Sequence, residues 1–493
     1  MTNILRHWLL TGFIFFIPTL CICQLLISEV SPFSGFNDVL GDNYDWIELY
    51  NSSTDTVLLS DYQISDDTNN WEKWIFPSYH LPPDSTMLLL ASGKDKRYVV
   101  DHWEQILGDG SLCRYITPNS QVDDDWLSLD FDDASWQMGP LSIGYGDNDD
   151  NTVTSNVTSI FIRRQFEIDS FDNVKYLAFH IDYDDGFIAY INGIEIARSI
   201  NMSNVMGNYN DLAEVEYEAV IYSGGEPGAY IFDHEFLSQN LFEGTNIISI
   251  QVHNASANSS DLTARPFLHI GVFDEVNLGN NEPSNWWTIP KTYYHSNFKL
   301  STGEPLIISK VDDSLIDVIT LNENLRDEIS MGYNSNNYNS ICYYDIPTPG
   351  YSNENSWCYS GIEDEPVFTL PSGWYDENIE VGLQTNNSDA IIKFTMNGDE
   401  PLNTDEYYSS PISLYETSII SAKSFSTNNN LPSSTSDAIY ILNEQQAGIN
   451  VFSVITDSLN LWDWETGIYV LGDNASSDYP YFGSNFWQPW SKK

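Results

Sequence analysis

The sequence predicts an all-β protein made of several β-sandwich modules. Tyr, Phe and Trp together make up 14% of the chain. Short segments of alternating apolar and polar residues recur throughout, separated by Asn, Asp, Gly and Ser, which is the pattern of strands joined by turns. Because 493 residues are too many for one ordinary domain, we expect roughly three or four modules.

The clearest local signal is a β-hairpin at residues 181–198. Residues 187–191 are β-formers, Asn192-Gly193 follows, and apolar and polar residues alternate again up to Arg198. An Asn-Gly pair between two such runs favours a type I′ turn, because both central residues of that turn need a positive φ. We therefore expect this hairpin in the middle of a β-sandwich.

Two acidic clusters are candidate calcium sites. One directly precedes the hairpin and the other lies in a Gly-, Asn- and Asp-rich loop. Their members are Asp182, Asp184 and Asp185, and Asp147, Asp149 and Asp150. Carboxylates this close repel one another unless water or a cation lies among them, and oxygen-rich loops suit Ca²⁺. Solvated acidic turns are the alternative, and calcium is the one cofactor that the sequence suggests.

The charge of the chain excludes some partners. With 71 acidic and 19 basic residues the formal net charge is −52. Such a surface repels nucleic acid and anionic membranes, keeps the protein in solution and attracts divalent cations.

Residues 1–23 have the pattern of a secretory signal peptide. Arg6 precedes an apolar stretch at residues 9–20, and the expected cleavage leaves Gln24 first. The rest of the sequence has no second hydrophobic span, so we expect a secreted or cell-surface protein with no membrane segment after cleavage. In an oxidising compartment Cys342 and Cys358 are close enough in sequence to pair, which leaves Cys113 over.

The segments after Gln24 resemble a lamin-tail domain, which is an immunoglobulin-like sandwich. The resemblance lies in the motifs ISEV, DWIELYN, LSDYQISDD and WIFP, which occur in this order from residue 27 to residue 77. Further strands of this pattern come only at residues 295–319, with a closing segment at 348–353. We therefore predict a sandwich in two halves, 24–100 and 288–354, with an inserted domain at 101–287. Two sandwiches in tandem are the alternative, but either half alone offers too few strands to close a core.

The inserted segment resembles a galactose-binding-like jelly-roll module. The resemblance lies in the motif DFDDASW at 130–136, in GYGDNDD at 144–150 and in the hairpin sequence YING at 190–193. Relatives of such modules include the non-catalytic sugar-binding domain of family-two glycosidases. The resemblance implies either sugar binding or a purely structural role.

Two more resemblances follow along the chain. Residues 362–443 are similar to the C-terminal immunoglobulin-like domain of chitobiases and β-hexosaminidases. The signature of that domain, Y-T-x-D-G-x-x-P, is matched loosely from Phe394 to Pro401, where Phe394 replaces the Tyr and Asn397 replaces the Asp. That domain is an accessory module, so it implies no catalysis. Residues 447–493 resemble the start of a CotH-type spore-coat kinase domain, which implies the truncated start of that domain.

The search for catalytic motifs finds none. The sequence lacks GxxxxGK[ST], HExxH, GxSxG and paired CxxC motifs, and its histidines follow no ligand spacing. We therefore expect a secreted, non-catalytic, multi-module protein that binds extracellular polysaccharide or a surface protein. The alternative is the N-terminal fragment of an exported CotH-type atypical protein kinase whose catalytic domain is missing from this sequence.

Overall fold

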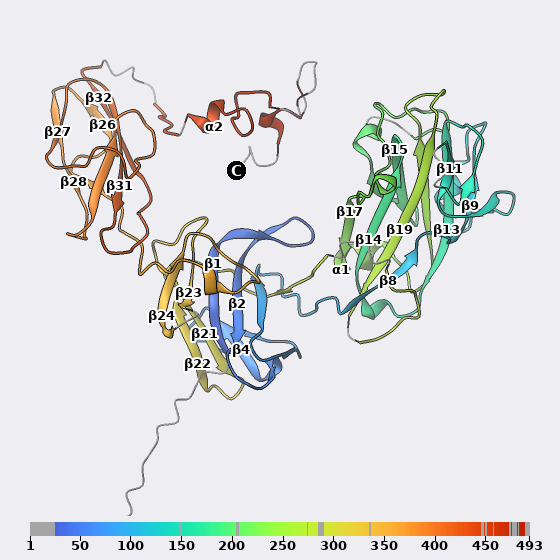
Figure 1. The fold of residues 1–493 in the computed structure, drawn as a ribbon, viewed down its shortest axis with the longest axis horizontal. Coiled ribbons are helices and arrows are strands. Elements are labelled where there is room, and N and C mark those ends of the chain that lie inside the picture. Colours follow the sequence, from blue (N-terminus) through green and yellow to red (C-terminus); the bar gives the residue numbers. More distant parts are fainter. Residues whose placement is uncertain are drawn as a thin grey trace, which may run out of the picture. The chain divides into compact units, whose positions relative to one another are not determined.

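The computed structural model describes residues 25–488 except 147–149, 204–206, 274, 284–289, 335–336, 445–447, 449–450, 457, 473–474, 476–480 and 482. The expected signal peptide therefore lies outside the described residues. The chain divides into two compact units. Unit 1 contains the residues up to Gly35, Asp45–Ala91 and Asn297 onward, and unit 2 contains Phe36–Tyr44 and Ser92–Ser296. The all-β prediction is confirmed, with short strands in several sheets (Figure 1).

The first sandwich of unit 1 is built from two stretches of chain that lie far apart in the sequence. One sheet contains, in order, β7 (Thr86–Ala91), β2 (Asn43–Asn51), β1 (Leu25–Asn37), β23 (Ser330–Asn334) and β24 (Asn337–Tyr344). The other contains β22 (Leu315–Thr320), β21 (Pro305–Lys310), β4 (Tyr62–Ser65) and β5 (Trp74–Ile75). β3 (Val57–Leu58) pairs with β6 (His80–Leu81). Each sheet thus joins strands from before residue 92 to strands from after residue 304.

The registers of these pairings fix how the two stretches meet. Glu29 of β1 lies opposite Gly332 of β23, and Ile64 of β4 lies opposite Ile308 of β21. Trp46 of β2 and Trp74 of β5 are both buried, and in β2 four consecutive residues, 46–49, are buried rather than every second one. A sheet cannot close without both stretches, since strands of each are neighbours in both sheets.

The two described stretches of chain that flank the inserted segment, 92–100 and 290–296, contact each other. The buried His295 Nδ1 lies 3.0 Å from Ser92 Oγ, and the Val100 amide donates to Thr292 Oγ1 at 2.7 Å. Lys96 also pairs with Asp233 at 2.8 Å. The entering and leaving chains are therefore bound to each other and to unit 2.

Unit 2 is a β-sandwich of two sheets. The first has the order β10 (Gln137–Pro140), β9 (Leu112–Ile116), β13 (Ser159–Ile168), β18 (Gly244–His253), β15 (Gly186–Ile191) and β16 (Ile194–Arg198). The second has the order β12 (Thr152–Val153), β11 (Ile143–Tyr145), β19 (Leu262–Val272), β14 (Val174–Tyr183) and β17 (Ala229–Asp233), and β8 (His102–Leu107) also pairs with β19. The one helix among its described residues that is longer than a 3-10 turn is α1 (His234–Asn240), which Asp233 caps.

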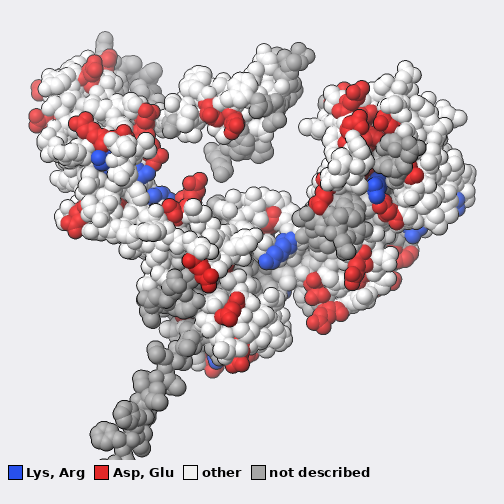
Figure 2. All heavy atoms as spheres, in the orientation of Figure 1, with Lys and Arg blue, Asp and Glu red and all other residues white. Residues whose placement is uncertain are grey.

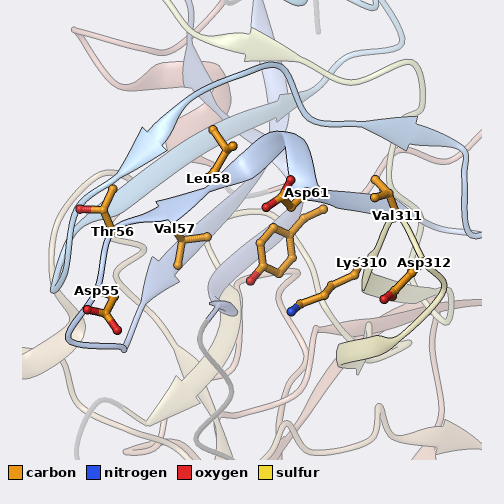
Figure 3. Close-up of a pocket in the computed structure, with 9 residues that line it drawn as sticks. Asp55, Thr56, Val57, Leu58, Asp61, Lys310, Val311 and Asp312 are labelled. Carbon is orange, nitrogen blue, oxygen red and sulfur yellow. The ribbon is translucent and has the colours of Figure 1, made fainter.

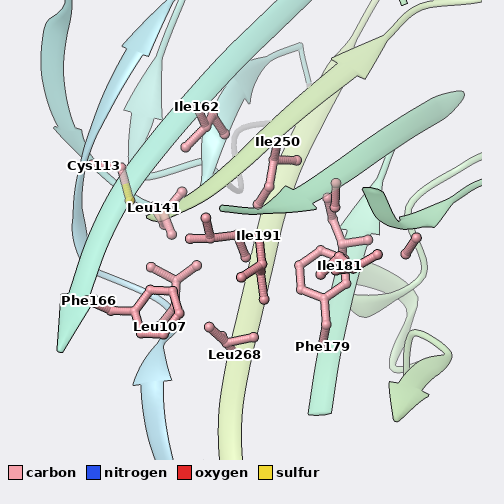
Figure 4. Close-up of a cluster of buried hydrophobic side chains, with 14 of the residues drawn as sticks. Leu107, Cys113, Leu141, Ile162, Phe166, Phe179, Ile181, Ile191, Ile250 and Leu268 are labelled. Atoms are coloured by element: carbon pink, nitrogen blue, oxygen red, sulfur yellow. The ribbon is translucent and has the colours of Figure 1, made fainter. Parts of the chain in front are cut away.

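The core of unit 2 lies between these sheets. Alternate apolar residues of the long strands meet there, among them Phe166, Phe179, Ile250 and Leu268 (Figure 4). The predicted hairpin is confirmed: β15 pairs with β16, and Asn192 and Gly193 have φ values of 49° and 85°. Asn and Gly are the residues that adopt this left-handed conformation most readily, so local turn chemistry sets this register.

The last part of unit 1 forms another small β-module. It contains the sheet β26 (Gly373–Tyr375), β32 (Ser436–Leu442), β31 (Ser418–Phe425) and β29 (Ile391–Thr395), and the pairs β27 (Ile379–Val381) with β30 (Ile412–Leu414) and β25 (Val367–Phe368) with β28 (Leu383–Gln384). Val381, Leu414, Ile420 and Tyr440 form its buried centre. Beyond it the described residues include one short helix, α2 (Leu459–Trp462).

The surface carries the expected charge. Figure 2 shows acidic side chains spread over the visible face, with far fewer basic ones. No helix within the described ranges is long and apolar enough to cross a membrane.

Candidate functional site

The acidic cluster before the hairpin is buried and faces backbone amides. Asp182 ends a core strand, and its carboxylate accepts hydrogen bonds from the amides of Val220, at 2.6 Å, and Ile221, at 3.1 Å. The amide of Ala219 donates to Asp184 Oδ1 at 2.7 Å. These bonds hold the segment from 217 to 221 against the end of β14.

Asp185 completes this arrangement. It has a φ of 53°, and its two oxygens accept from the amides of Tyr217, at 2.8 Å, and Ala255, at 2.7 Å. The three side chains are between 1% and 6% exposed, so a bare charge there would be costly, and amide dipoles offset that cost. The cluster thus fixes the segment 217–221 and the Ala255 amide by hydrogen bonds, which the sequence did not reveal.

The predicted calcium sites can be compared with the structure only at the described members of the two clusters, Asp150, Asp182, Asp184 and Asp185. Among the described residues there is no group of three or more His, Cys, Asp or Glu side chains that could hold a metal ion. Asp147 and Asp149 lie outside the described residues. Asp150 is described, and a Cβ at Gly144 would lie 2.2 Å from its Oδ2, so this loop packs tightly against β11. Calcium binding stays a prediction.

The predicted cysteine pair is joined in the structure. A disulfide links Cys342 of β24 to Cys358, with the Cα atoms 5.0 Å apart. Next to it Tyr343 and Tyr359 exchange two backbone hydrogen bonds of 3.0 and 3.1 Å. Cys113 is buried, and burial raises the pKa of its thiol to about 12. We call residues 345–357, which the disulfide closes into a loop, the strap.

Two buried glutamates of the first sandwich hold the strap. Glu29 accepts from the Thr348 amide at 3.1 Å and from Thr348 Oγ1 at 2.8 Å, and it also accepts from the Ser330 hydroxyl. Burial is the main influence on this carboxyl and raises its pKa, although these hydrogen bonds lower it in part.

Glu48 holds the strap two residues further on. Its Oε2 accepts from the Gly350 amide at 2.9 Å, and its Oε1 accepts from Ser28 Oγ at 2.7 Å. Glu48 is only 1% exposed. The strap is therefore fixed at its ends by covalent and backbone bonds and in its middle by two carboxylates.

A groove of about 560 Å³ lies beside the strap, within unit 1. Four neighbouring strands supply residues to it: Thr86 from β7, Glu48 and Tyr50 from β2, Ser28 from β1 and Tyr333 from β23. Asp84 and the strap residues Ser352, Asn353 and Glu354 complete its lining. This volume lies in the range typical of small-molecule sites, roughly 300–1,000 Å³.

A second pocket of the same sandwich, of about 390 Å³, has a different lining (Figure 3). Lys310 lies in it together with Asp55, Asp61 and Asp312. Lys310 Nζ is 5.9 Å from the centre of the Tyr62 ring. Its charges are mixed, so this pocket offers less electrostatic selectivity than the groove beside the strap.

The sequence reasoning missed the groove. A signal was present, because Ser28 and Glu48 are polar residues inside otherwise apolar strand motifs, and Thr348-Pro349-Gly350 closes the lamin-tail pattern. What joined them was not visible in the sequence, since Glu48 and Gly350 are 302 positions apart.

Two families match parts of this chain. Residues 22–154 match the Lamin Tail Domain, and residues 370–436 match the Chitobiase/beta-hexosaminidase C-terminal domain. Both resemblances expected from the motifs are confirmed, and these two matches do not show the jelly-roll module or the CotH-type domain. The first match runs into strands of unit 2, whereas strand pairing completes the first sandwich with residues 305–344. No curated protein matches the chain.

Solved structures with partial similarity are glycosidases. The structure of a beta-glucuronidase from glycoside hydrolase family 2 has 10% identity and a TM-score of 0.23, and the match covers 69% of this chain and 30% of that one. The Faecalibacterium prausnitzii beta-glucuronidase has 9% identity and a TM-score of 0.19, with 69% and 46% covered. This chain thus spans less than half of these structures, and at such TM-scores the similarity supports no functional argument.

Proposed function

We propose that this protein is an exported, non-catalytic, multi-module protein that binds extracellular polysaccharide or a cell-surface partner. The match of residues 370–436 to a carbohydrate-related domain is the observation that carries the proposal. Much of the rest of the described chain forms two β-sandwiches, and sandwiches present loops and sheet faces to ligands without needing catalytic groups. We further propose that the expected signal peptide directs export and that the inserted sandwich of unit 2 is a galactose-binding-like jelly-roll.

Affinity electrophoresis tests this function. The full chain is run through native gels that contain one soluble glycan each, and through a gel without glycan as the control. Retardation by one or more glycans supports polysaccharide binding. If no glycan retards the chain and insoluble glycans do not pull it down, the polysaccharide part of the proposal is wrong.

Export has its own test. The N-terminus of protein recovered from the culture medium or cell surface should begin at Gln24. Protein that stays inside the cell with Met1 intact would refute export.

The second candidate function is that of the N-terminal part of an exported CotH-type kinase. The observation in its favour is the apolar surface of the last described segment, where Phe452, Val454 and Trp462 are 90%, 84% and 62% exposed. Apolar side chains exposed together mark a surface that packs against something else. Sequencing the coding region beyond Lys493 tests this, and an immediate stop codon with no kinase frame behind it would refute it.

A further inference from the structure

The floor of the groove beside the strap is a row of hydroxyls and rings across one sheet. Ser28, Tyr50 and Tyr333 come from three neighbouring strands, β1, β2 and β23. Tyr50 Oη donates to Asp84 Oδ1 at 3.1 Å, and Tyr333 Oη donates to Asp317 Oδ1 at 2.7 Å. Because these bonds anchor the hydroxyl ends of both rings, each ring has a fixed place in the groove, which lowers the entropy lost when a ligand packs on it.

One wall of the groove is as firmly placed as its floor. Asn353 is buried and Glu354 is exposed, and both belong to the strap that the disulfide and the two glutamates hold. Asp84, which also lines the groove, adopts a φ of 53° in the turn before β7. The groove is therefore preformed rather than dependent on an open loop.

The charge of the lining selects the ligand. Glu48, Asp84 and Glu354 are the ionisable carboxyl groups in the lining, and none of the described residues that form it is Lys, Arg or His. Ionised carboxylates only accept hydrogen bonds, so a ligand must bring donors, and an anion is repelled. In the half-open setting of this groove a cation gains more than a neutral donor does.

The tyrosine rings and hydroxyl groups of the lining further restrict the class of ligand that fits. Tyrosine rings offer flat apolar surface, and Ser28, Thr86 and Ser352 offer small hydroxyls that both donate and accept. A lysine side chain would pair with the carboxylates but would make no hydrogen bond to the hydroxyls and no flat contact with the tyrosine rings. A sugar ring with an amine uses both kinds of group.

We propose that this groove binds a saccharide that carries free amino groups. This inference rests on the proposed function and names its ligand class and its site. The ammonium group lies among Asp84 and Glu354, and the sugar ring packs against Tyr50 and Tyr333.

Calorimetric titration of the full chain tests the ligand class. The probes are a glucosamine oligosaccharide, its fully N-acetylated counterpart of equal length and an oligolysine of similar charge. The glucosamine oligosaccharide should bind about tenfold more tightly than the acetylated one, and the difference should shrink at high salt. Equal binding of the acetylated oligosaccharide overturns the role of the amine, and equal binding of oligolysine overturns the saccharide.

Paired variants test the site. Asp84→Asn with Glu354→Gln removes two charges from the groove and should weaken glucosamine-oligosaccharide binding about tenfold. Asn tolerates the φ of residue 84, and Glu354 is exposed, so both changes preserve the fold. The control, Asp55→Asn with Glu72→Gln, removes two exposed charges elsewhere in the same sandwich and should leave binding unchanged.

The outcomes separate this inference from the proposed function. If the control weakens binding as much as the groove variant does, the effect is one of net charge and the groove is not the site. If glycans retard the full chain in gels but no glucosamine oligosaccharide binds, the proposed function stands and this inference falls.

Discussion

Acidification should unfold unit 2 because four of its histidines are buried in the neutral form. Burial lowers the pKa of His180 and His253 to about 4 and that of His269 and His295 to about 3. The rings of His180 and His269 are also packed edge to face with centroids 5.6 Å apart, so a charge on one disfavours a charge on the other. The unfolded chain takes up these protons near pH 6.5.

The direction and size of the effect follow from linkage. Since the folded pKa values lie below the unfolded value, the unfolded state binds more protons, and stability is complete above pH 6.5 and falls as the pH drops below it. At pH 5 each such histidine costs about 2 kcal/mol, so the four together cost about 8 kcal/mol. That is comparable to the whole stability of a domain, roughly 5–15 kcal/mol.

The first sandwich should respond differently over the same range. Burial raises the pKa of Asp45 to about 6 and also raises that of Glu29. A folded carboxyl with a raised pKa binds the proton before the unfolded one does, so acidification toward pH 5 favours the folded state there. Unit 2 should therefore unfold first.

Denaturant unfolding at pH 8, 6.5 and 5, followed by fluorescence and by proteolysis of unit 2, measures this. His269→Gln removes one titrating group, so the pH slope of unit 2 stability near pH 5 should fall by about 1.3 kcal/mol per pH unit. Leu237→Ala, which shortens a buried and non-titrating side chain of α1, is the control and should lower the stability without changing that slope. An unchanged slope in His269→Gln, or a unit 2 as stable at pH 5 as at pH 8, would refute the reasoning.

Three further predictions concern stability. The double variant Cys342→Ala with Cys358→Ala opens a loop with a sequence separation of 16 residues. Its first sandwich should lose about 3 kcal/mol of unfolding free energy in guanidinium, while the stability of unit 2 should not change. An unchanged stability of the first sandwich would mean that Glu29 and Glu48 hold the strap without the disulfide. Asp185→Asn keeps one carbonyl acceptor in place of two carboxylate oxygens and should cost unit 2 about 1–3 kcal/mol. If calcium binds at this cluster, millimolar calcium should raise the melting temperature of the natural sequence and the variant should blunt that rise, whereas a melting temperature that ignores calcium and chelator would refute the metal site. Replacement of residues 101–287 by a short Gly-Ser linker should leave the first sandwich folded, with near-ultraviolet circular dichroism signals from the buried Trp46 and Trp74. Gly332→Ala should abolish these signals, because the added Cβ would lie 1.9 Å from Ser28 O. An unfolded deletion protein would favour the tandem arrangement.

The sequence determined the features that depend on neighbours along the chain. Alternation of apolar and polar residues in short segments predicted the all-β class, because a strand's side chains point to opposite faces in turn. Asn192-Gly193 fixed the hairpin, since few other pairs adopt positive φ twice.

Only the tertiary structure decided what the polar side chains do. The sequence showed that Asp182, Asp184 and Asp185 need a positive partner, but not which one, because the Ala219 amide that meets Asp184 is 35 positions away. The groove is a stronger case, since Ser28 and Tyr50 of its floor are separated from the strap in the chain by residues 92–296 of unit 2. Periodicity and turn chemistry act over a few residues. Contacts between distant residues depend on the order of the strands in the sheets, and the same local sequence pattern is compatible with many strand orders.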